Sequence, residues 1–336
     1  MGRDFSADDG GERSPPAPET ETPAAPAGGG RQSRPVVGIA LKVTSALLFT
    51  VMVTLIKLLG DRVPSGEIVF ARNFFGLVPV LAMIVLRGEV GTAFRTRRPL
   101  GHFGRAIAGT GAMLLWFESI SRLPLADATA ISYAAPLITL VLAVLLLGER
   151  VRTTRWLAVG LGLVGVLVVL SPHLAGMDGG EREALGALSA ATAAFFMAFA
   201  MIFIRTLTGT EATATIVVYF TLASTVLSLL TLPFGWVVPS AGDATLLVFV
   251  GLIGGVAQLF LTHAYRYADA SVIAPFEYTT MLWALVVGFV LFAEVPSLVV
   301  LAGAAIIVAA GLAIILRESR LGIRRPERSE AAPPKG

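Results

Sequence analysis

The sequence is poor in the residues that most often carry catalysis. It contains no cysteine and only three histidines, His102, His173 and His263, among 336 residues. The absence of cysteine excludes disulfides, thiolate nucleophiles and cysteine-based metal sites. The histidines lack metal-ligand spacing, and neither a P-loop nor a GxSxG motif occurs. We therefore expect no catalytic residue, no metal and no cofactor, which argues against an enzyme and against an ATP-driven pump.

Charged residues are also scarce. They make up 15% of the chain, whereas 55% is hydrophobic, a composition unlike that of soluble domains. Apolar runs of about 20 residues recur, and each is long enough to cross the ~30 Å hydrocarbon core of a bilayer as a helix. Because a helix satisfies its own backbone polar groups, it is a structure that lipid tolerates. The sequence predicts an all-α membrane protein whose main surroundings are the lipid bilayer.

The two ends of the chain differ from the rest in composition. Residues 1–34 are rich in Pro, Gly, Ala, Glu and Ser and contain almost no large apolar residue. Such a segment cannot bury enough apolar surface to fold, so we expect a disordered N-terminal arm. It lacks the hydrophobic core of a secretory signal. Residues 317–336 predict a basic, disordered tail.

Ten apolar runs lie between these ends, and each predicts one membrane-spanning helix. Polar breaks, such as residues 95–99 and 171–183, indicate the loops. The first five helices are expected at 36–59, 66–86, 101–121, 126–147 and 155–171. The second five are expected at 184–205, 214–235, 245–265, 271–293 and 297–316.

The arginines concentrate in alternate loops, and basic loops tend to remain in the cytoplasm. Because these arginines lie between apolar runs, they indicate topology and not a nucleic-acid partner. An even number of spans places both basic ends of the chain on the basic side, so we expect both termini in the cytoplasm. The basic side carries Arg87, Arg95, Arg97, Arg98, Arg105, Arg150, Arg152, Arg155 and Arg266, and the other carries Arg62, Arg122 and Arg182.

The two halves of the chain repeat each other. Residues 122–131 (RLPLADATAI) are echoed by residues 266–273 (RYADASVI), and both stretches open a span. Lys57 and Arg205 match near the ends of the first and sixth spans, as Glu149 and Glu294 do after the fourth and ninth. A repeat of five spans is odd, so the second copy must enter the membrane from the opposite side. The sequence thus predicts two inverted five-helix repeats, at 36–171 and 184–316.

This duplicated unit, with its Ala-Asp-Ala-[Thr/Ser] helix start and Leu-Gly-Glu-type end, resembles the EamA domain of the drug/metabolite transporter superfamily. The resemblance covers about residues 36–316. It implies a central cavity lined mainly by the first four helices of each unit, and transport of a small organic metabolite. Inverted repeats are typical of secondary transporters that work by alternating access. The alternatives are a membrane-embedded enzyme and a passive solute channel. Import or export, proton coupling, exchange or facilitated diffusion, and a homodimer all remain open.

Ionisable groups inside spans are costly, so they are candidates for function. Arg72, beside Asn73, lies roughly 10 Å into the second span, and Glu118 lies at a similar depth in the third. They are interpreted either as a substrate site or as a structural ion pair. His263 and Glu277, in the eighth and ninth spans, form the second candidate pair. They predict either proton coupling or structural contacts.

Aromatic side chains on the inner spans form a third set of candidates for substrate binding. They can clamp a flat or cationic solute by stacking, or they can serve packing alone. The five are Trp116, Tyr133, Tyr219, Tyr278 and Trp283. With the charged candidates, they favour a zwitterionic or aromatic substrate such as an amino acid, an S-adenosylmethionine-like metabolite or a vitamin-like metabolite.

The arginine asymmetry generates a prediction of topology. Reporter fusions at both termini, Arg97 and Arg152 should report cytoplasm, and fusions near Arg62, Gly179 and Gly242 should report the outside. Paired phosphatase and fluorescent-protein fusions measure this. A cytoplasmic signal at Gly179 would contradict the inverted repeat, because that loop joins the two copies.

Overall fold

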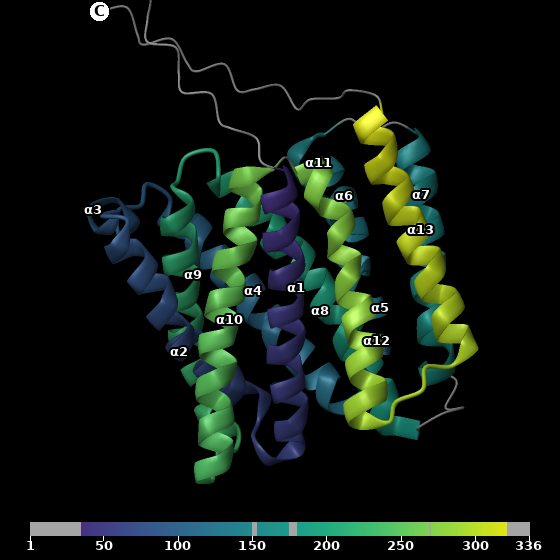
Figure 1. Cartoon of the computed structure of the whole chain (residues 1–336), viewed down its shortest axis with the longest axis horizontal. Helices are drawn as coiled ribbons and strands as arrows, with labels where there is room; N and C mark the ends of the chain where they lie inside the picture. The colour runs from purple at the N-terminus through teal and green to yellow at the C-terminus, as the bar shows by residue number, and fades with distance from the viewer. Residues whose placement is uncertain (1–34, 150–152, 175–179, 269, 321–336) are drawn as a thin grey trace, which may run out of the picture. The chain divides into compact units, whose positions relative to one another are not determined.

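The computed structural model describes residues 35–149, 153–174, 180–268 and 270–320 of the chain. Within these ranges the chain is almost entirely helical and contains no β-strand (Figure 1). The expected disordered arm and most of the expected tail lie outside the described residues. The ranges instead cover the ten apolar runs that the sequence predicts as spans.

The helices follow the predicted order. In the first half they are α1 (Pro35–Leu59), η1 (Gly60–Arg62), α2 (Ser65–Leu86), α3 (Val90–Ala93), α4 (Pro99–Arg122), α5 (Leu125–Ser132), α6 (Ala134–Leu147) and α7 (Thr153–Leu174). In the second half they are α8 (Gly180–Leu207), α9 (Thr213–Ser228), η2 (Leu229–Phe234), α10 (Ala241–Tyr267), α11 (Ala270–Ile273), η3 (Ala274–Tyr278), α12 (Thr279–Phe292) and α13 (Leu298–Arg320).

The described helices make this a multi-pass membrane protein. Eight are long and apolar enough to cross a membrane. The other two predicted spans also form helices, α4 and α13. In α4, His102, Arg105 and Glu118 dilute the apolar character, and the apolar part of α13 is the shorter stretch Leu298–Ala313. The count of ten spans therefore stays a prediction.

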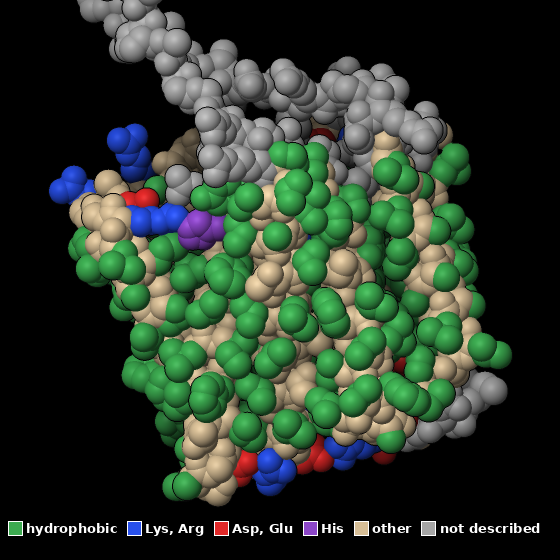
Figure 2. Space-filling model, viewed as in Figure 1, with side chains coloured by type: hydrophobic (Ala, Val, Ile, Leu, Met, Phe, Trp, Pro, Cys, Tyr) green, Lys and Arg blue, Asp and Glu red, His purple; other side chains and the backbone are tan. Residues whose placement is uncertain are grey.

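The surface of the helical body matches a lipid environment. Hydrophobic side chains cover the visible face, and charged side chains gather at its two ends (Figure 2). Along α7, for example, Leu157, Leu161 and Val164 are exposed. Such a large exposed apolar surface is unfavourable in water and marks a surface that contacts another apolar phase.

The second copy is inverted relative to the first. Arg182, at the beginning of α8, donates to Asp61, just beyond the end of α1, at 2.7 Å. It also donates to the Ser121 carbonyl at the end of α4. Because α8 starts where α1 ends, matching helices of the two copies run in opposite directions. This confirms the inverted repeat that an odd number of spans per copy predicts.

Matching helices also pack in matching pairs. α1 packs along α10, and its counterpart α8 packs along α4. Both contacts are close: a Cβ on Gly38 of α1 would lie 2.6 Å from the Cβ of Ala268, and a Cβ on Gly186 of α8 would lie 2.8 Å from the Cβ of Arg122. The pairs α2 with α9 and α7 with α13 join equivalent helices of the two copies. The same packing is thus used twice.

The fourth and ninth spans are interrupted at related places. α5 ends at Ser132, and α6 begins after Tyr133. Pro136, which has no backbone N–H to donate, lies in the first turn of α6. In the ninth span, α11 passes into the 3-10 segment η3, which contains Pro275. Proline removes a helical hydrogen bond and crowds the preceding turn. An interruption near a proline therefore occurs in both copies.

Glycines bring α7 and α13 into backbone contact. A Cβ on Gly165 would lie 2.9 Å from the Gly303 carbonyl oxygen, and a Cβ on Gly303 would lie 2.8 Å from that of Gly165. Gly160, one and a half turns earlier on α7, has open space around its missing Cβ. Small residues at such contacts let two helices approach closely in lipid.

This contact predicts a contrast between two substitutions on one helix. Gly165→Val should lower the stability of the folded protein by roughly 1–3 kcal/mol, because backbone atoms of α13 cannot move aside cheaply. Gly160→Val is the matched control, since it makes the same chemical change where space is free. Thermal unfolding of both variants in detergent measures the difference. Equal melting midpoints would show that the α7 to α13 contact is not tight.

Candidate functional site

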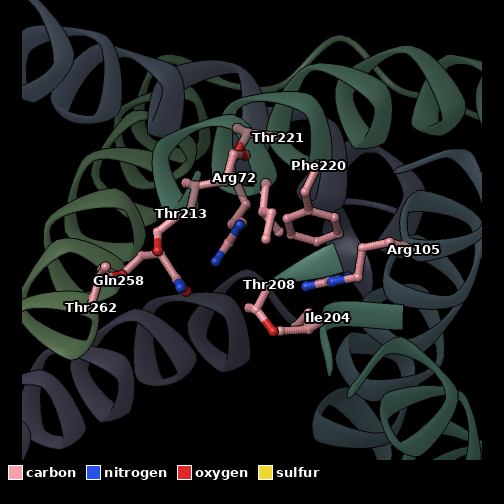
Figure 3. Close-up of a pocket in the computed structure, with 11 residues that line it drawn as sticks. Arg72, Arg105, Ile204, Thr208, Thr213, Phe220, Thr221, Gln258 and Thr262 are labelled. Atoms are coloured by element: carbon pink, nitrogen blue, oxygen red, sulfur yellow. The ribbon is translucent and has the colours of Figure 1, made fainter. Parts of the chain in front are cut away.

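A cavity of about 150 Å³ lies among α2, α4, α8, α9 and α10. Arg72 and Arg105 reach it from different helices with their nitrogen atoms toward its centre (Figure 3). The rest of the lining is apolar or uncharged and includes the Phe220 ring and the Gln258 amide. No acidic side chain occurs in the described lining. The cavity is therefore a positively charged site inside an apolar bundle.

Arg72 is held at the cavity by its neighbour in the sequence. Its Nη1 donates to the Asn73 Oδ1 at 3.1 Å, and the Nδ2 of the fully buried Asn73 donates to the Val69 carbonyl at 2.8 Å. The Arg72 Nε is buried and has no hydrogen-bond partner among the described residues. The predicted pair of Arg72 and Asn73 thus sits at the cavity, with Asn73 positioning the guanidinium.

Arg105 is the second cation of the cavity, and the sequence analysis placed it among the basic loop residues. It lies in α4, where its guanidinium Cζ stands 3.8 Å from the centre of the Phe220 ring. Gly109 makes room for this arrangement, because a Cβ there would lie 2.0 Å from the Arg105 Nη1. The position of Arg105 inside the predicted span 101–121 was the signal that could have identified it.

Glu118 does not join Arg72. It accepts from the Arg122 Nε at 2.8 Å and from the Ser65 hydroxyl at 2.6 Å. Arg122 lies four residues further along α4, on the same helix face and at its end. It therefore reaches Glu118 more directly than Arg72, whose guanidinium faces the cavity. The expected pair of Arg72 and Glu118 is not formed.

His263 and Glu277 are also separate. The Nε2 of His263 contacts the Arg87 Nη2 at the end of α2, and its Nδ1 lies 2.7 Å from the Leu259 carbonyl. Glu277 forms an ion pair with Lys42 of α1, whose side chain is 4% exposed. His263 faces α2, whereas Glu277 lies against α1. Lys42 was overlooked, although a lysine inside an apolar run is itself an uncommon signal.

The five aromatic candidates do not line the cavity. The Tyr133 hydroxyl contacts the Thr280 hydroxyl at 2.5 Å and accepts from the Met281 N–H, and its ring packs edge-on against Tyr278 near Glu277. The Tyr219 hydroxyl donates to the Phe94 carbonyl at 3.0 Å, close to the loop. Trp116 packs in the core, and Trp283 buries an indole N–H without a partner. The structure therefore divides the aromatics among several places.

Two ion pairs occupy equivalent positions at opposite ends of the repeats. Lys57, at the end of α1, pairs with Glu294, just after α12, and Arg205, at the end of α8, pairs with Glu149, just after α6, at 3.2 Å. The first pair is enclosed, with side chains 14% and 16% exposed. The second is open, with side chains 31% and 47% exposed.

The enclosed pair also holds the turn between α4 and α5. The Lys57 Nζ donates to the Leu123 carbonyl at 2.6 Å, and the Glu294 Oε2 accepts from the Leu125 N–H at 2.8 Å. The pair thereby binds a free carbonyl at one helix end and a free N–H at the next helix start. The open pair lies at the other end of the bundle, beside the cavity residues Ile204 and Thr208.

A buried histidine joins the two copies at the same end as the enclosed pair. The Nε2 of His173 lies 2.9 Å from the Asp127 Oδ2, and its Nδ1 lies 3.0 Å from the Glu183 Oε2. These residues come from the end of α7 and the beginnings of α5 and α8. Both ring nitrogens are thus occupied, which fixes the orientation of the ring. No cluster that could hold a metal ion occurs among the described residues.

Comparison with known proteins finds the same family twice along the chain. The EamA-like transporter family matches residues 36–171 and 184–317. A solved crystal structure shares the fold, with a TM-score of 0.60 and 22% identity over 84% of this chain and 98% of the other.

Three curated relatives are similar over most of their length. The S-adenosylmethionine uptake transporter of Rickettsia prowazekii is 30% identical over 84% of this chain and 94% of its own. The pseudopaline exporter CntI of Pseudomonas aeruginosa is 28% identical over 82% and 95%. The riboflavin transporter of Rhizobium johnstonii is 30% identical over 86% and 94%. All three are named as transporters and none as an enzyme.

Proposed function

The chain belongs to the EamA-like transporter family, and we propose that it is a secondary active transporter working by alternating access in the cytoplasmic membrane. Metabolite transport is common to its relatives, whose named substrates are chemically diverse. Ten spans with both termini in the cytoplasm complete the proposal. In this orientation the end with Arg205 and the cavity faces the cytoplasm, and the end with Lys57 faces outside.

The two equivalent ion pairs are the observation on which the proposal of alternating access rests. Because the copies are inverted, Lys57 with Glu294 and Arg205 with Glu149 stand at opposite membrane faces. Closing one end and opening the other exchanges the environments of two equivalent contacts, which is how inverted repeats produce alternating access. The enclosed outer pair and the half-exposed inner pair correspond to a state that is sealed outside and open toward the cytoplasm.

Proton coupling is proposed to run through Glu277, with Lys42 as its partner in place of His263. The lysine is buried, whereas the Glu277 side chain is 49% exposed. Protonation of the carboxylate would remove its charge and leave Lys42 unpaired in a poorly hydrated place. A buried pair that loses one charge becomes strongly unfavourable. Proton binding at Glu277 would therefore shift the balance between states.

The first test uses the absence of native cysteine. In Gln258→Cys the single thiol replaces a half-buried side chain that lines the cavity, and a membrane-impermeant maleimide should label it faster from the cytoplasmic face than from outside. Adding Lys57→Met should raise the outside rate, because Glu294 and the α4 to α5 turn lose their anchor. Arg62→Met is the control, since Arg62 pairs with Asp243 at the same end but is exposed. Equal rates from both faces without Lys57→Met would contradict the proposed state.

The second test separates coupling from transport in proteoliposomes. Glu277→Gln mimics the protonated acid, so it should abolish pH-driven accumulation while substrate exchange between equal compartments continues. Glu118→Gln is the matched control, because this glutamate is also inside a span and paired with an arginine; it should keep pH-driven accumulation. Full accumulation by Glu277→Gln would refute the role of Glu277, and loss of exchange as well would assign it to substrate binding.

A further inference from the structure

The cavity contains two cations without counter-charges. Neither Arg72 nor Arg105 has a carboxylate partner among the described residues, and both side chains line the same cavity. The acids that could have served are engaged elsewhere. Glu118 pairs with Arg122, Glu277 with Lys42, and Glu294 with Lys57.

Glu211, in the loop beside the cavity, is engaged as well. It accepts from the Arg97 N–H at 2.7 Å and from the Thr96 hydroxyl at 3.1 Å. Two like charges facing one cavity repel each other, and charges inside a membrane protein normally find partners. The positive charge of this cavity is therefore not neutralised by a described carboxylate, and a mobile anion could neutralise it.

Unused hydrogen-bond donors also support an anionic ligand in this cavity. The buried Nε of Arg72 and the buried Nε and Nη1 of Arg105 have no acceptor in the part of the chain that the structure describes. Unsatisfied buried donors are rare in folded proteins and call for an explanation such as a ligand. Guanidinium groups bind carboxylates through two parallel hydrogen bonds. The donors and the charge therefore fit the same kind of group.

The size and lining of the cavity limit the ligand further. A space of about 150 Å³ is comparable to an engineered protein cavity that holds benzene, so it suits a molecule of roughly eight non-hydrogen atoms. Thr221, Gln258 and Thr262 offer polar groups, and Phe220 offers a flat apolar face. In this conformation the cavity is small for a nucleoside or a flavin, and its charge disfavours a cation.

We infer that this cavity takes a small organic anion with two carboxylate groups, one held by Arg72 and the other by Arg105. The inference rests on the proposed function, because it makes this anion the transported substrate. Arg105 is pre-positioned by Phe220, and Arg72 by Asn73. The four-carbon dicarboxylate succinate serves as the probe.

Binding is measured by thermal unfolding of the purified full chain in an uncharged detergent. A ligand that binds the folded state raises its melting temperature, and the rise grows with the logarithm of the ratio of ligand concentration to dissociation constant. Succinate should do so, and added salt should weaken the effect. The uncharged succinamide and the cationic 1,4-diaminobutane match succinate in length and should have no effect. Stabilisation by either of these to the same degree would overturn the inference, and so would the absence of stabilisation by succinate.

Variants then assign the binding to the two arginines. Arg72→Gln and Arg105→Gln should each weaken succinate binding roughly tenfold or more, because each removes a charge-assisted pair of hydrogen bonds. Arg95→Gln is the control, since Arg95 is exposed in the loop before α4 at the same end of the bundle, and its effect should stay within about twofold. Arg72→Lys and Arg105→Lys keep the positive charge and replace the glutamine variants if those do not fold. Both lysine variants should bind succinate more weakly than the native chain, because lysine lacks the two parallel donors of arginine. Unchanged binding by the arginine variants would refute the site.

A lipid phosphate is the other source of an anion. Stabilisation by phosphatidylglycerol in phosphatidylcholine nanodiscs, lost in Arg105→Gln and not matched by succinate, would assign the cavity to a headgroup and overturn the inference. Because these measurements need no transport, they are independent of the labelling of Gln258→Cys. If succinate fails but that thiol is still labelled from one face only, the anion proposal falls and alternating access stands. If succinate binds but labelling is equal from both faces, the reverse holds.

Discussion

A charge inside a bundle of helices in lipid must find a partner or water, and this constraint determines how the two copies meet. Lys42 of the first copy pairs with Glu277 of the second, Lys57 with Glu294, and Glu149 with Arg205. Such pairs contribute little net stability, because desolvation offsets their attraction. An uncompensated charge would cost much more. The pairs therefore fix how one copy is aligned on the other.

Arg72 and Arg105 are the exception to this rule, and they lie together. The bundle contains enough acids to neutralise them, but Glu118, Glu277 and Glu294 are paired with other cations. Asn73 and Phe220 hold the two guanidinium groups with uncharged contacts, which position a cation without cancelling its charge. Proteins commonly break their own packing rules where they function. The charged cavity is a place where the described part of this chain departs from that rule, which supports its proposal as the functional site.

Much of the architecture follows from the sequence, because lipid imposes a simple pattern of long apolar runs and basic loops. The repeat even predicted that Lys57 corresponds to Arg205 and Glu149 to Glu294. It did not predict that these residues pair with each other across the copies. A repeat tells which positions are equivalent, whereas a contact depends on which helices of the other copy lie opposite.

The candidate site was only partly accessible to the same reasoning. Arg72 was found because a charge within a span is costly, but its expected partner Glu118 lies within one turn of Arg122. Arg105 was assigned to a loop because its charge agreed with the basic side. Lys42 satisfied the rule used for Arg72 and was passed over. His263 lies on the face of α10 that meets Arg87 at the end of α2, whereas Glu277 meets Lys42 of α1. The periodicity of one sequence does not specify how a helix is rotated about its axis relative to its neighbours.

Divergence between the two copies explains why the two ends of the bundle are not energetically alike. Lys57 and Glu294 bind backbone groups of the turn between α4 and α5 in addition to each other. The structure shows Arg205 and Glu149 half-exposed, where water competes for both charges and an ion pair contributes little. Two inverted copies with identical sequences would hold both ends equally. In the proposed alternating-access cycle, divergence of their charged residues would set a resting preference for one state, and a ligand with differential affinity of only a few kcal/mol would reverse it.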